Sequence, residues 1–588
     1  MRFIFAIVSF VIAALLIATG VAQKTIFLPP DEVTASVSVD SAATVSIIDG
    51  ATMQTFPHQQ TLSVGGSSEV FTAYGRTADV MAWVGDASYN LITYSAKTKN
   101  LSSKLVTKSD TEVPDPTGSD LWFAEYTDTV SLKQRLTMDD TVSLIIVSNG
   151  TDPAPPNIAL AWPVNNATPW ATPLPIGGGI VLLLGLGLLL WAIAHLRNSR
   201  GPRRRSPKMP KLPKQPRYKP SKARKALPAS TRGRRSTRTT MIAAPLAIAS
   251  IIALSGCTAD PTVAPNADTV EATPTPDAAA EKSAAPPTAV TERQANRIVQ
   301  RIAQVAGEAD KTLDADLLQT RFAGDALALR SAAYKVKKVD DAEPLPSVIL
   351  DHTVEIVLPQ QNAGWPRTVF VVVRDEADET IAPIAMMLIQ NDPRSQYLVH
   401  YAVDLEPGTV VPEVAPADIG TSRIGPDQLS NFYVADPSEI ATDYGDILNK
   451  GEKSEFFALF DATGDTLRDV VGVEAKKKLK KDLPDTAKLT FSNATGAGEV
   501  IVMATLDTGA IVAVSLDEIQ TIKPIETGAT ANAPKGMKAL AGKSVSDTGF
   551  TATYGDQLLF YVPSAAEGGL IKLLGYSTGL VSASELKK

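Results

Sequence analysis

The chain has 588 residues, enough for three or four domains, and a formal charge of -7 at pH 7. That average conceals a division, because residues 197–240 hold 17 of the 56 Lys and Arg residues and none of the 63 Asp and Glu residues. A single cysteine excludes an intramolecular disulfide framework and any metal site built from several cysteines. The sequence predicts no metal ion or other cofactor.

Two uncharged apolar segments predict membrane helices. Residues 3–22 follow Met1-Arg2, and residues 176–196 are followed at once by a run of arginines. About 20 apolar residues span the hydrocarbon core, and the basic flank of a span faces the cytoplasm. We interpret residues 1–22 as an N-terminal transmembrane anchor, with a cleaved signal segment as the alternative. Residues 23–175 are then extracytoplasmic and residues 197–240 cytoplasmic.

Residues 23–170 predict an exterior all-β sandwich. Val33, Ala35, Val37 and Val39 alternate with polar residues, which is the pattern of a half-buried strand. Many short strands without helical periodicity favour two packed sheets. The other strands are expected at residues 44–48, 69–73, 79–84, 90–94, 121–126, 130–136, 142–147 and 158–162. Five aromatic residues are expected to fill the core and not to form a glycan-binding platform: Trp83, Tyr89, Tyr94, Trp122 and Tyr126.

The basic segment, residues 197–240, contains seven prolines and predicts an extended, disordered cytoplasmic chain. Juxtamembrane Lys and Arg clusters are attracted to anionic lipid headgroups. Only Tyr218 offers a ring on which a base could stack, so nucleic acid is not an expected partner. We expect this segment to set the topology and to lie on the lipid surface.

The only cysteine follows a third apolar run, residues 241–256. At 16 residues this run reaches about 24 Å, short of a comfortable span. Basic residues precede the run, and Leu254-Ser255-Gly256-Cys257 ends it, an order that resembles a bacterial lipoprotein signal with lipidation at Cys257. The alternative is a short, tilted transmembrane helix with an incidental cysteine. Either interpretation places residues 257–588 outside the membrane.

Residues 257–289 predict a disordered tether, because Ala, Pro, Thr and Asp dominate them. An α+β lobe is then expected over residues 290–408. Thr291 and Gln294 form a capping-box pattern, and Ala295, Ile298 and Ile302 begin one apolar helical face that continues through Val305 and Ala309. Further helices are expected at residues 314–318 and 325–334, and strands at residues 347–358, 367–373, 382–390 and 397–405.

A second lobe is expected over residues 409–588. One helix is expected from residue 436 to about 451 and another from about 466 to 479, followed by strands at residues 489–492, 499–506, 510–515, 551–561 and 571–575. The pattern Phe322-Ala-Gly324-Asp325 is echoed 138 residues later by Phe460 with Gly464-Asp465. Two lobes of this kind resemble tandem α+β domains of the nuclear-transport-factor-2-like type.

Several local patterns have some features of binding sites but predict ordinary structure. Residues 536–544 have five residues between their glycines where a phosphate-binding loop needs four. Residues 461–465 lack the ligand spacing of a calcium loop and suit a helix-entry turn. His352 is expected to point into an apolar layer and His400 onto the opposite face from Tyr401, so the two need not meet. The lysines of residues 476–481 suit a solvated helix end, with an anionic wall polymer as the alternative.

The order of these segments resembles that of uncharacterised envelope membrane proteins and lipoproteins of high-GC Gram-positive (actinobacterial) bacteria. The resemblance implies a non-enzymatic envelope protein that presents exterior modules for binding or assembly at the cell surface. Its partners would be the lipid bilayer and an envelope protein or glycan. The alternative is an enzyme or accessory factor acting on cell-wall or surface polysaccharide. No catalytic residue is predicted.

Overall fold

The computed structural model describes residues 2–28, 30–56, 59–109, 112–164, 167–199, 285–425 and 431–587. These residues belong to a multidomain protein of mixed α and β structure, and they divide into two compact units. The first unit contains the two apolar helices, and the second contains residues 24–169 and the residues from 284 onward. Residues 200–284 lie outside the described residues, and with them most of the predicted basic segment, the third apolar run, Cys257 and most of the predicted tether, as does His58. The tether was expected to continue to residue 289, but Thr288 and Ala289 are buried and Thr288 forms a β-bridge with Gln361, so the end of that prediction is wrong.

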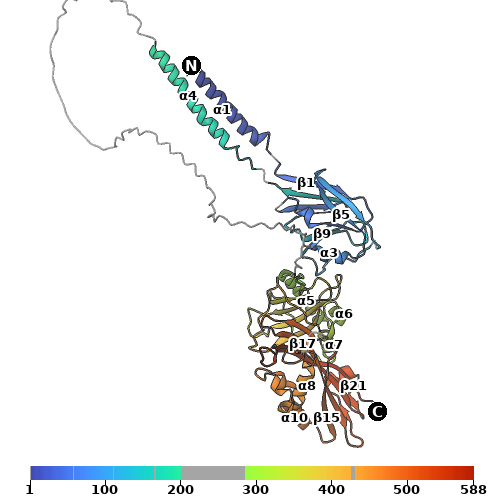
Figure 1. The fold of residues 1–588 in the computed structure, drawn as a ribbon. Helices are drawn as coiled ribbons and strands as arrows, with labels where there is room; N and C mark the ends of the chain where they lie inside the picture. The colour runs from blue at the N-terminus through green and yellow to red at the C-terminus, as the bar shows by residue number, and fades with distance from the viewer. Residues whose placement is uncertain are drawn as a thin grey trace, which may run out of the picture. The chain divides into compact units, whose positions relative to one another are not determined.

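The first unit is a pair of apolar helices, α1 (Arg2–Thr25) and α4 (Pro173–Ser199), which lie side by side (Figure 1). Both are long and apolar enough to cross a membrane. Glycines allow the helices to approach each other. A Cβ added at Gly178 would lie 2.6 Å from Ile17, and one at Gly185 would lie 3.1 Å from Ser9. Small residues at such contacts are typical of helix pairs in lipid.

The N-terminal β-domain, residues 30–164, consists of two sheets and two short helices. One sheet has the strand order β1-β10-β3-β8, and the other has the order β6-β5-β2-β9-β4-β7. Each expected strand region except residues 79–84 contains a strand, and two strands were not expected, β3 and β6. The elements are β1 (Glu32–Ser38), β2 (Val45–Ile48), α2 (Gly50–Met53), β3 (Gln60–Gly65), β4 (Val70–Arg76), α3 (Thr77–Val84), β5 (Tyr89–Ser95), β6 (Asn100–Val106), β7 (Ala124–Asp128), β8 (Ser131–Leu136), β9 (Val142–Val147) and β10 (Asn157–Pro163).

The strand expected at residues 79–84 is wrong, because this stretch is helix α3. A short apolar run does not by itself distinguish a buried strand from a buried helix. The helix packs Val80, Trp83 and Val84 onto one face of the six-stranded sheet, where they join Trp122 in a core cluster. A second cluster draws buried residues from both sheets. Trp83 and Trp122 are therefore core residues, as predicted, while Tyr94 and Tyr126 pack half-buried against the second cluster.

The C-terminal region, residues 285–587, is built on one nine-stranded sheet of order β11-β12-β13-β14-β21-β20-β17-β15, with β16 paired to β17. Its first half contains α5 (Glu292–Thr312), α6 (Ala315–Leu318), α7 (Gly324–Lys337), β11 (Val354–Pro359), β12 (Arg367–Val373), β13 (Ile384–Gln390) and β14 (Leu398–Leu405). Its second half contains α8 (Ile440–Lys450), η2 (Gly451–Lys453), η3 (Phe457–Leu459), α9 (Leu467–Val471), α10 (Val473–Lys481), β15 (Ala487–Thr495), β16 (Ile501–Ala504), β17 (Ala510–Pro524), β18 (Ala531–Asn532), α11 (Lys535–Ala541), β19 (Val545–Ser546), β20 (Phe550–Val562) and β21 (Lys572–Glu585).

The expected helices and strands are largely present, but α11, β18 and β19 were not expected, and β17 and β21 continue well beyond their expected ends. Two further differences concern the first strand and the helix around Gly472. The first strand begins at Val354 and not at residue 347, and the helix expected through residue 479 is divided at Gly472 into α9 and α10. A Cβ at Gly472 would lie 2.2 Å from the carbonyl oxygen of Arg468, so the chain bends there through a close approach that only glycine permits.

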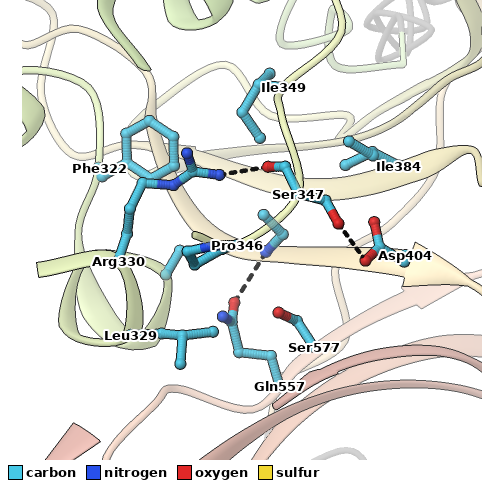
Figure 2. Close-up of a pocket in the computed structure, with 12 residues that line it drawn as sticks. Phe322, Leu329, Arg330, Pro346, Ser347, Ile349, Ile384, Asp404, Gln557 and Ser577 are labelled. Atoms are coloured by element: carbon cyan, nitrogen blue, oxygen red, sulfur yellow. Dashed lines mark hydrogen bonds between the residues drawn. The ribbon is translucent and has the colours of Figure 1, made fainter. Parts of the chain in front are cut away.

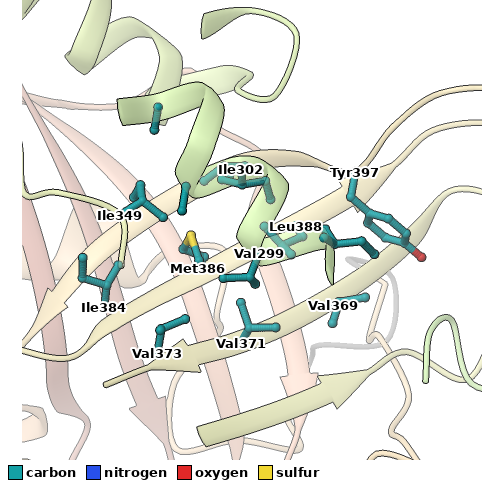
Figure 3. Close-up of a cluster of buried hydrophobic side chains, with 14 of the residues drawn as sticks. Val299, Ile302, Ile349, Val369, Val371, Val373, Ile384, Met386, Leu388 and Tyr397 are labelled. Carbon is teal, nitrogen blue, oxygen red and sulfur yellow. The ribbon is translucent and has the colours of Figure 1, made fainter. Parts of the chain in front are cut away.

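Three large apolar layers and one small cluster around Met537 and Phe550 lie in the described residues of the C-terminal region. One lies between α5–α7 and the first strands, where Val299 and Ile302 of α5 meet Val371 and Met386 (Figure 3). A second lies between the helices of the second half and β16, β17, β20 and β21. The third contains the opposite faces of both sets of strands, for example Phe370 and Met387 together with Ile511. Each half therefore has helices on one sheet face and meets the other half through the remaining face.

The two echoed sequence patterns occupy equivalent local structures. Phe322 forms a parallel bridge with Val399, and Phe460 forms one with Ile571. Both phenylalanines are buried, and Gly324 and Gly464 both have positive φ, at 54° and 77°. The repeated sequence pattern therefore corresponds to the same local structure in both halves, a buried phenylalanine followed by a glycine with positive φ.

Helix α5 begins with the predicted capping box. Thr291 accepts a hydrogen bond from the backbone nitrogen of Gln294, and the Gln294 side chain accepts one from the backbone nitrogen of Thr291. Replacing Thr291 by alanine is expected to lower the free energy of unfolding by about 1 kcal/mol, because the backbone nitrogen of Gln294 loses its acceptor, the Thr291 hydroxyl. Thermal unfolding of the full chain in detergent would show this as a decrease of about 2–4 °C. The exposed Thr312→Ala at the other end of α5 should leave the midpoint unchanged, and an equal decrease in both variants would contradict the capping role.

Candidate functional site: a buried arginine junction

The loop of residues 116–123 holds the central carboxylate of the site, Asp120. Gly118 takes a left-handed conformation with φ of 74°, which allows the tight turn after Pro116. The buried Trp122 fixes the loop, because its indole nitrogen donates a hydrogen bond to the carbonyl oxygen of Pro116 at 2.8 Å. The loop is thus held by the β-domain core, and Asp120 stands free of β-strand pairing.

Asp120 is fully buried and receives hydrogen bonds from the C-terminal region. Arg321 donates to both carboxylate oxygens, at 2.6 and 3.4 Å, and the backbone nitrogen of Tyr397 donates at 2.9 Å. Arg301 approaches the same carboxylate at 3.4 Å. A buried charge is costly unless it is paired and hydrogen-bonded. These donors meet that requirement for Asp120.

Helix α5 presents a polar stripe to the same loop. Gln294 donates to the carbonyl oxygens of residues 120 and 121, at 3.2 and 3.0 Å, and Arg297 donates to those of residues 122 and 123. Arg301 donates to the carbonyl oxygen of Gly118 at 2.7 Å and pairs with Glu125 at 2.8 Å. Positions separated by three or four residues share a helix face. The apolar face of α5 therefore packs in the core, and this polar face binds the β-domain.

A second buried carboxylate, Asp79 of α3, pairs with Arg367 of β12 at 2.6 Å. Both side chains are almost wholly buried. Arg76 lies 3.7 Å from the same carboxylate, and burial lowers the pKa of Arg76 below its ordinary value. The guanidinium of Arg367 also lies over the Trp365 ring, 4.0 Å from its centroid, and Trp365 packs against the β-domain core.

Arg394 adds a third point of attachment, in the turn between β13 and β14. Its guanidinium donates to the carbonyl oxygens of Trp83 and Val84, at 2.8 and 3.0 Å, and lies over the Trp83 ring. Arginine suits this task because its planar fork donates several hydrogen bonds and keeps its charge when buried. We refer to all of these contacts between the β-domain and the C-terminal region as the arginine junction. It consists of hydrogen bonds, ion pairs and cation–π contacts, and the Nη1 atoms of Arg76 and Arg367 are buried in it without a hydrogen-bond partner.

One enclosed cavity in the described residues is small. Figure 2 shows it under α7, where Arg330 donates to the carbonyl oxygen of Ser347 and the Ser347 hydroxyl donates to Asp404, each at 2.6 Å. Gln557 closes the cavity by accepting from the backbone nitrogen of Ala402. Burial raises the pKa of Asp404. The volume is about 20 Å³, enough for one water molecule and too little for a substrate.

A buried ionic cluster lies beneath α10. Lys476 donates to Glu518 at 2.7 Å and also to Asn449 and the carbonyl oxygen of Leu448. Asp556 lies in the middle of β20, and burial raises its pKa to about 8. The sequence placed Lys476 in a solvated helix end. The structure corrects this, because Lys476 is buried, whereas Lys477 and Lys478 of the same run are exposed.

The residues singled out from the sequence are not brought together. Leu254, Ser255, Gly256 and Cys257 lie outside the described residues. His400 is half-buried and alternates with the buried Tyr401, as expected. His352 is not in an apolar layer, because its side chain is 46% exposed and lies 3.5 Å from Asp375.

The glycine-rich stretch that resembles a phosphate-binding loop has an ordinary structure. Residues 535–541 form helix α11, which ends at a left-handed Gly542, so this stretch is not a phosphate-binding loop. In the described ranges, no group of three or more His, Cys, Asp or Glu side chains could hold a metal ion.

Burial lowers the pKa of His400, whose Nε2 is buried without a hydrogen-bond partner.

The arginine junction was missed from the sequence, although α5 contains a signal for it. Arg293, Arg297 and Arg301 are spaced by four residues, and like charges at that spacing destabilise an isolated helix. Such a stripe indicates an acceptor outside the helix. Nothing in a single sequence identifies that acceptor as residues 118–125.

The comparisons with known proteins concern the C-terminal region. Residues 286–585 match a family described as a domain of unknown function (DUF8094). No curated protein and no solved structure matches the chain. The likeness to nuclear-transport-factor-2-like domains therefore stays a prediction. Because the match covers just over half of the 588 residues, the chain belongs to the DUF8094 family.

Proposed function

We propose that the protein is a non-enzymatic component of the bacterial cell envelope that presents its β-domain and C-terminal region outside the membrane for binding or assembly. The observation that carries the proposal is the arginine junction. Its buried ion pairs hold the β-domain and the C-terminal region together.

Helices α1 and α4 would be the membrane anchors, and the two-sheet β-domain between them would be an extracytoplasmic β-sandwich. The close approach of Gly178 to α1 supports an N-terminal helix that is retained, because a cleaved segment would leave α4 without this contact. The arginines after α4 would face the cytoplasm and attract anionic headgroups.

Residues 257–588 would be the second exterior part, released from the preceding chain by cleavage before Cys257 and anchored by lipid on that cysteine. The test uses full-length protein tagged at both ends, in the wild type and in Cys257→Ala. We expect two membrane-bound fragments in the wild type and one full-length species in the variant. One unlipidated full-length chain in both strains would refute the lipoprotein assignment.

A role in handling cell-wall or surface polysaccharide is the second candidate. An open cavity of about 670 Å³ lies beside the arginine junction, and its lining includes Tyr74, Phe123, Asp139, Arg293 and Asn296. Aromatic rings next to hydrogen-bonding side chains are a common lining for sugars. Calorimetric titration with soluble wall-derived oligosaccharides would test it, and the absence of heat at millimolar concentrations would count against it.

A further inference from the structure

We infer that the arginine junction is a protein–protein interface in its own right, which keeps residues 30–164 bound to residues 285–587 when the chain between them is cut. The inference deepens the proposed function, because a cut before Cys257 would make these parts separate molecules. The binding itself does not depend on where, or whether, the cell makes that cut.

The contacts do not use the intervening chain. The hydrogen bonds of the junction join residues 173 to 311 positions apart, and their carboxylates, Asp79, Asp120 and Glu125, all lie before α4. On the other side, the contacts begin at Thr288 and Gln294. A cut anywhere in residues 200–284 would therefore leave every one of these contacts in place.

Each part has its own apolar core. The clusters of buried residues in the β-domain contain no buried residue of the C-terminal region, and the converse also holds among the described residues. One half-buried side chain, Trp365, crosses to pack on the core around Trp83 and Trp122. The β-domain and the C-terminal region therefore contact each other as two separately packed domains, as the two proteins of a complex do.

The composition of the junction is that of an interface between proteins. Arginine and tryptophan are enriched among the residues that dominate binding, and here five arginines of the C-terminal region surround Trp83, Trp122 and the three carboxylates. The carboxylates of the junction belong to the β-domain and most of its arginines belong to the C-terminal region. Arg76 is the arginine that the β-domain contributes. Such complementarity speeds encounter and favours one partner over others. It also makes binding weaker at high salt.

The test uses the full chain in detergent, with Cys257→Ala to remove the lipid and a site-specific protease sequence inserted within residues 270–283. The released C-terminal fragment then has no membrane helix and no lipid, so detergent cannot hold it to the rest. We expect it to remain bound to the N-terminally tagged fragment at 0.15 M salt. Prompt release of a folded fragment at that salt concentration would overturn the inference.

A matched pair of variants distinguishes the junction from general adhesion. Arg394→Ala removes two hydrogen bonds to the β-domain and should weaken binding about tenfold or more. Arg374→Ala removes an exposed arginine of the same region that pairs with Glu355, and it should leave binding unchanged. Equal effects of the two substitutions would overturn the inference. Circular dichroism of each fragment verifies folding, and the tagged-chain test of Cys257 reports separately on natural processing.

Discussion

Replacing Asp120 by asparagine is expected to weaken binding between the β-domain and the C-terminal region by about 3–5 kcal/mol. The substitution keeps the shape of the side chain and removes its charge. Arg321, which is buried, would then lack its counter-ion, while Arg301 would keep its ion pair with Glu125. Breaking one side of a buried ion pair typically has a cost of this size. In the protease-cut protein this corresponds to a dissociation constant raised about a hundredfold to several thousandfold.

Asp120→Asn should leave the β-domain itself folded, because the donors to its carboxylate come from the C-terminal region. Binding is measured by surface plasmon resonance after the cut, and folding by near-ultraviolet dichroism of the buried tryptophans. Asp128→Asn, at an exposed end of β7, is the matched control. A variant that binds within threefold of the wild type would show that the Asp120 pairs do not hold the junction.

Asp556→Asn is expected to stabilise the C-terminal region at pH 8 and to change how stability depends on pH. Asp556 is 1% exposed, and Thr578 donates to one of its oxygens at 2.5 Å while the other has no hydrogen-bond partner. Burial is the main cause of its raised pKa of about 8, and the Glu518 carboxylate adds to it. The folded protein therefore holds a proton that the unfolded chain releases near pH 4.

The sign follows from proton linkage. Because the folded state binds more protons, the stabilising effect of the protonated Asp556 is fully present below pH 4 and is lost as the pH rises to about 8. Four pKa units correspond to about 5 kcal/mol over that range. An asparagine in place of Asp556 does not titrate, so this part of the pH dependence should disappear.

The measurement is denaturant unfolding between pH 5 and pH 8.5. We expect Asp556→Asn to unfold at a higher denaturant concentration than the wild type at pH 8, with the difference shrinking toward pH 5. Asp482→Asn, at the exposed end of α10, is the control and should follow the wild type. A variant less stable than the wild type at pH 8 would show that the ionised carboxylate is accommodated.

The features predicted well from the sequence depend on residues close together in the chain. The capping box of α5 needs positions 291 and 294 alone, and the alternation of β14 needs eight consecutive residues. The two apolar helices are also local, since length and composition define them. In each case the physical cause lies within one element, so a single sequence contains it.

The junction could not be predicted because its partners are distant. Asp79 and Arg367 are 288 positions apart, and each resembles an ordinary surface charge until the fold buries both. Helix α3 was mistaken for a strand for a related reason. Its apolar residues pack against Trp122 and the six-stranded sheet, and that contact, not the local pattern, selects its conformation.

The apolar layer that the two halves of the C-terminal region share has an evolutionary consequence. Phe370, Met387, Tyr401 and their neighbours on one half are covered by Ile511, Ala513 and Leu559 on the other. If the echoed pattern reflects duplication of an ancestral unit, both copies now have an apolar sheet face that must be covered by the other copy. The copies have become mutually obligate, so a natural deletion of either one would leave the survivor prone to aggregation and not a smaller working protein.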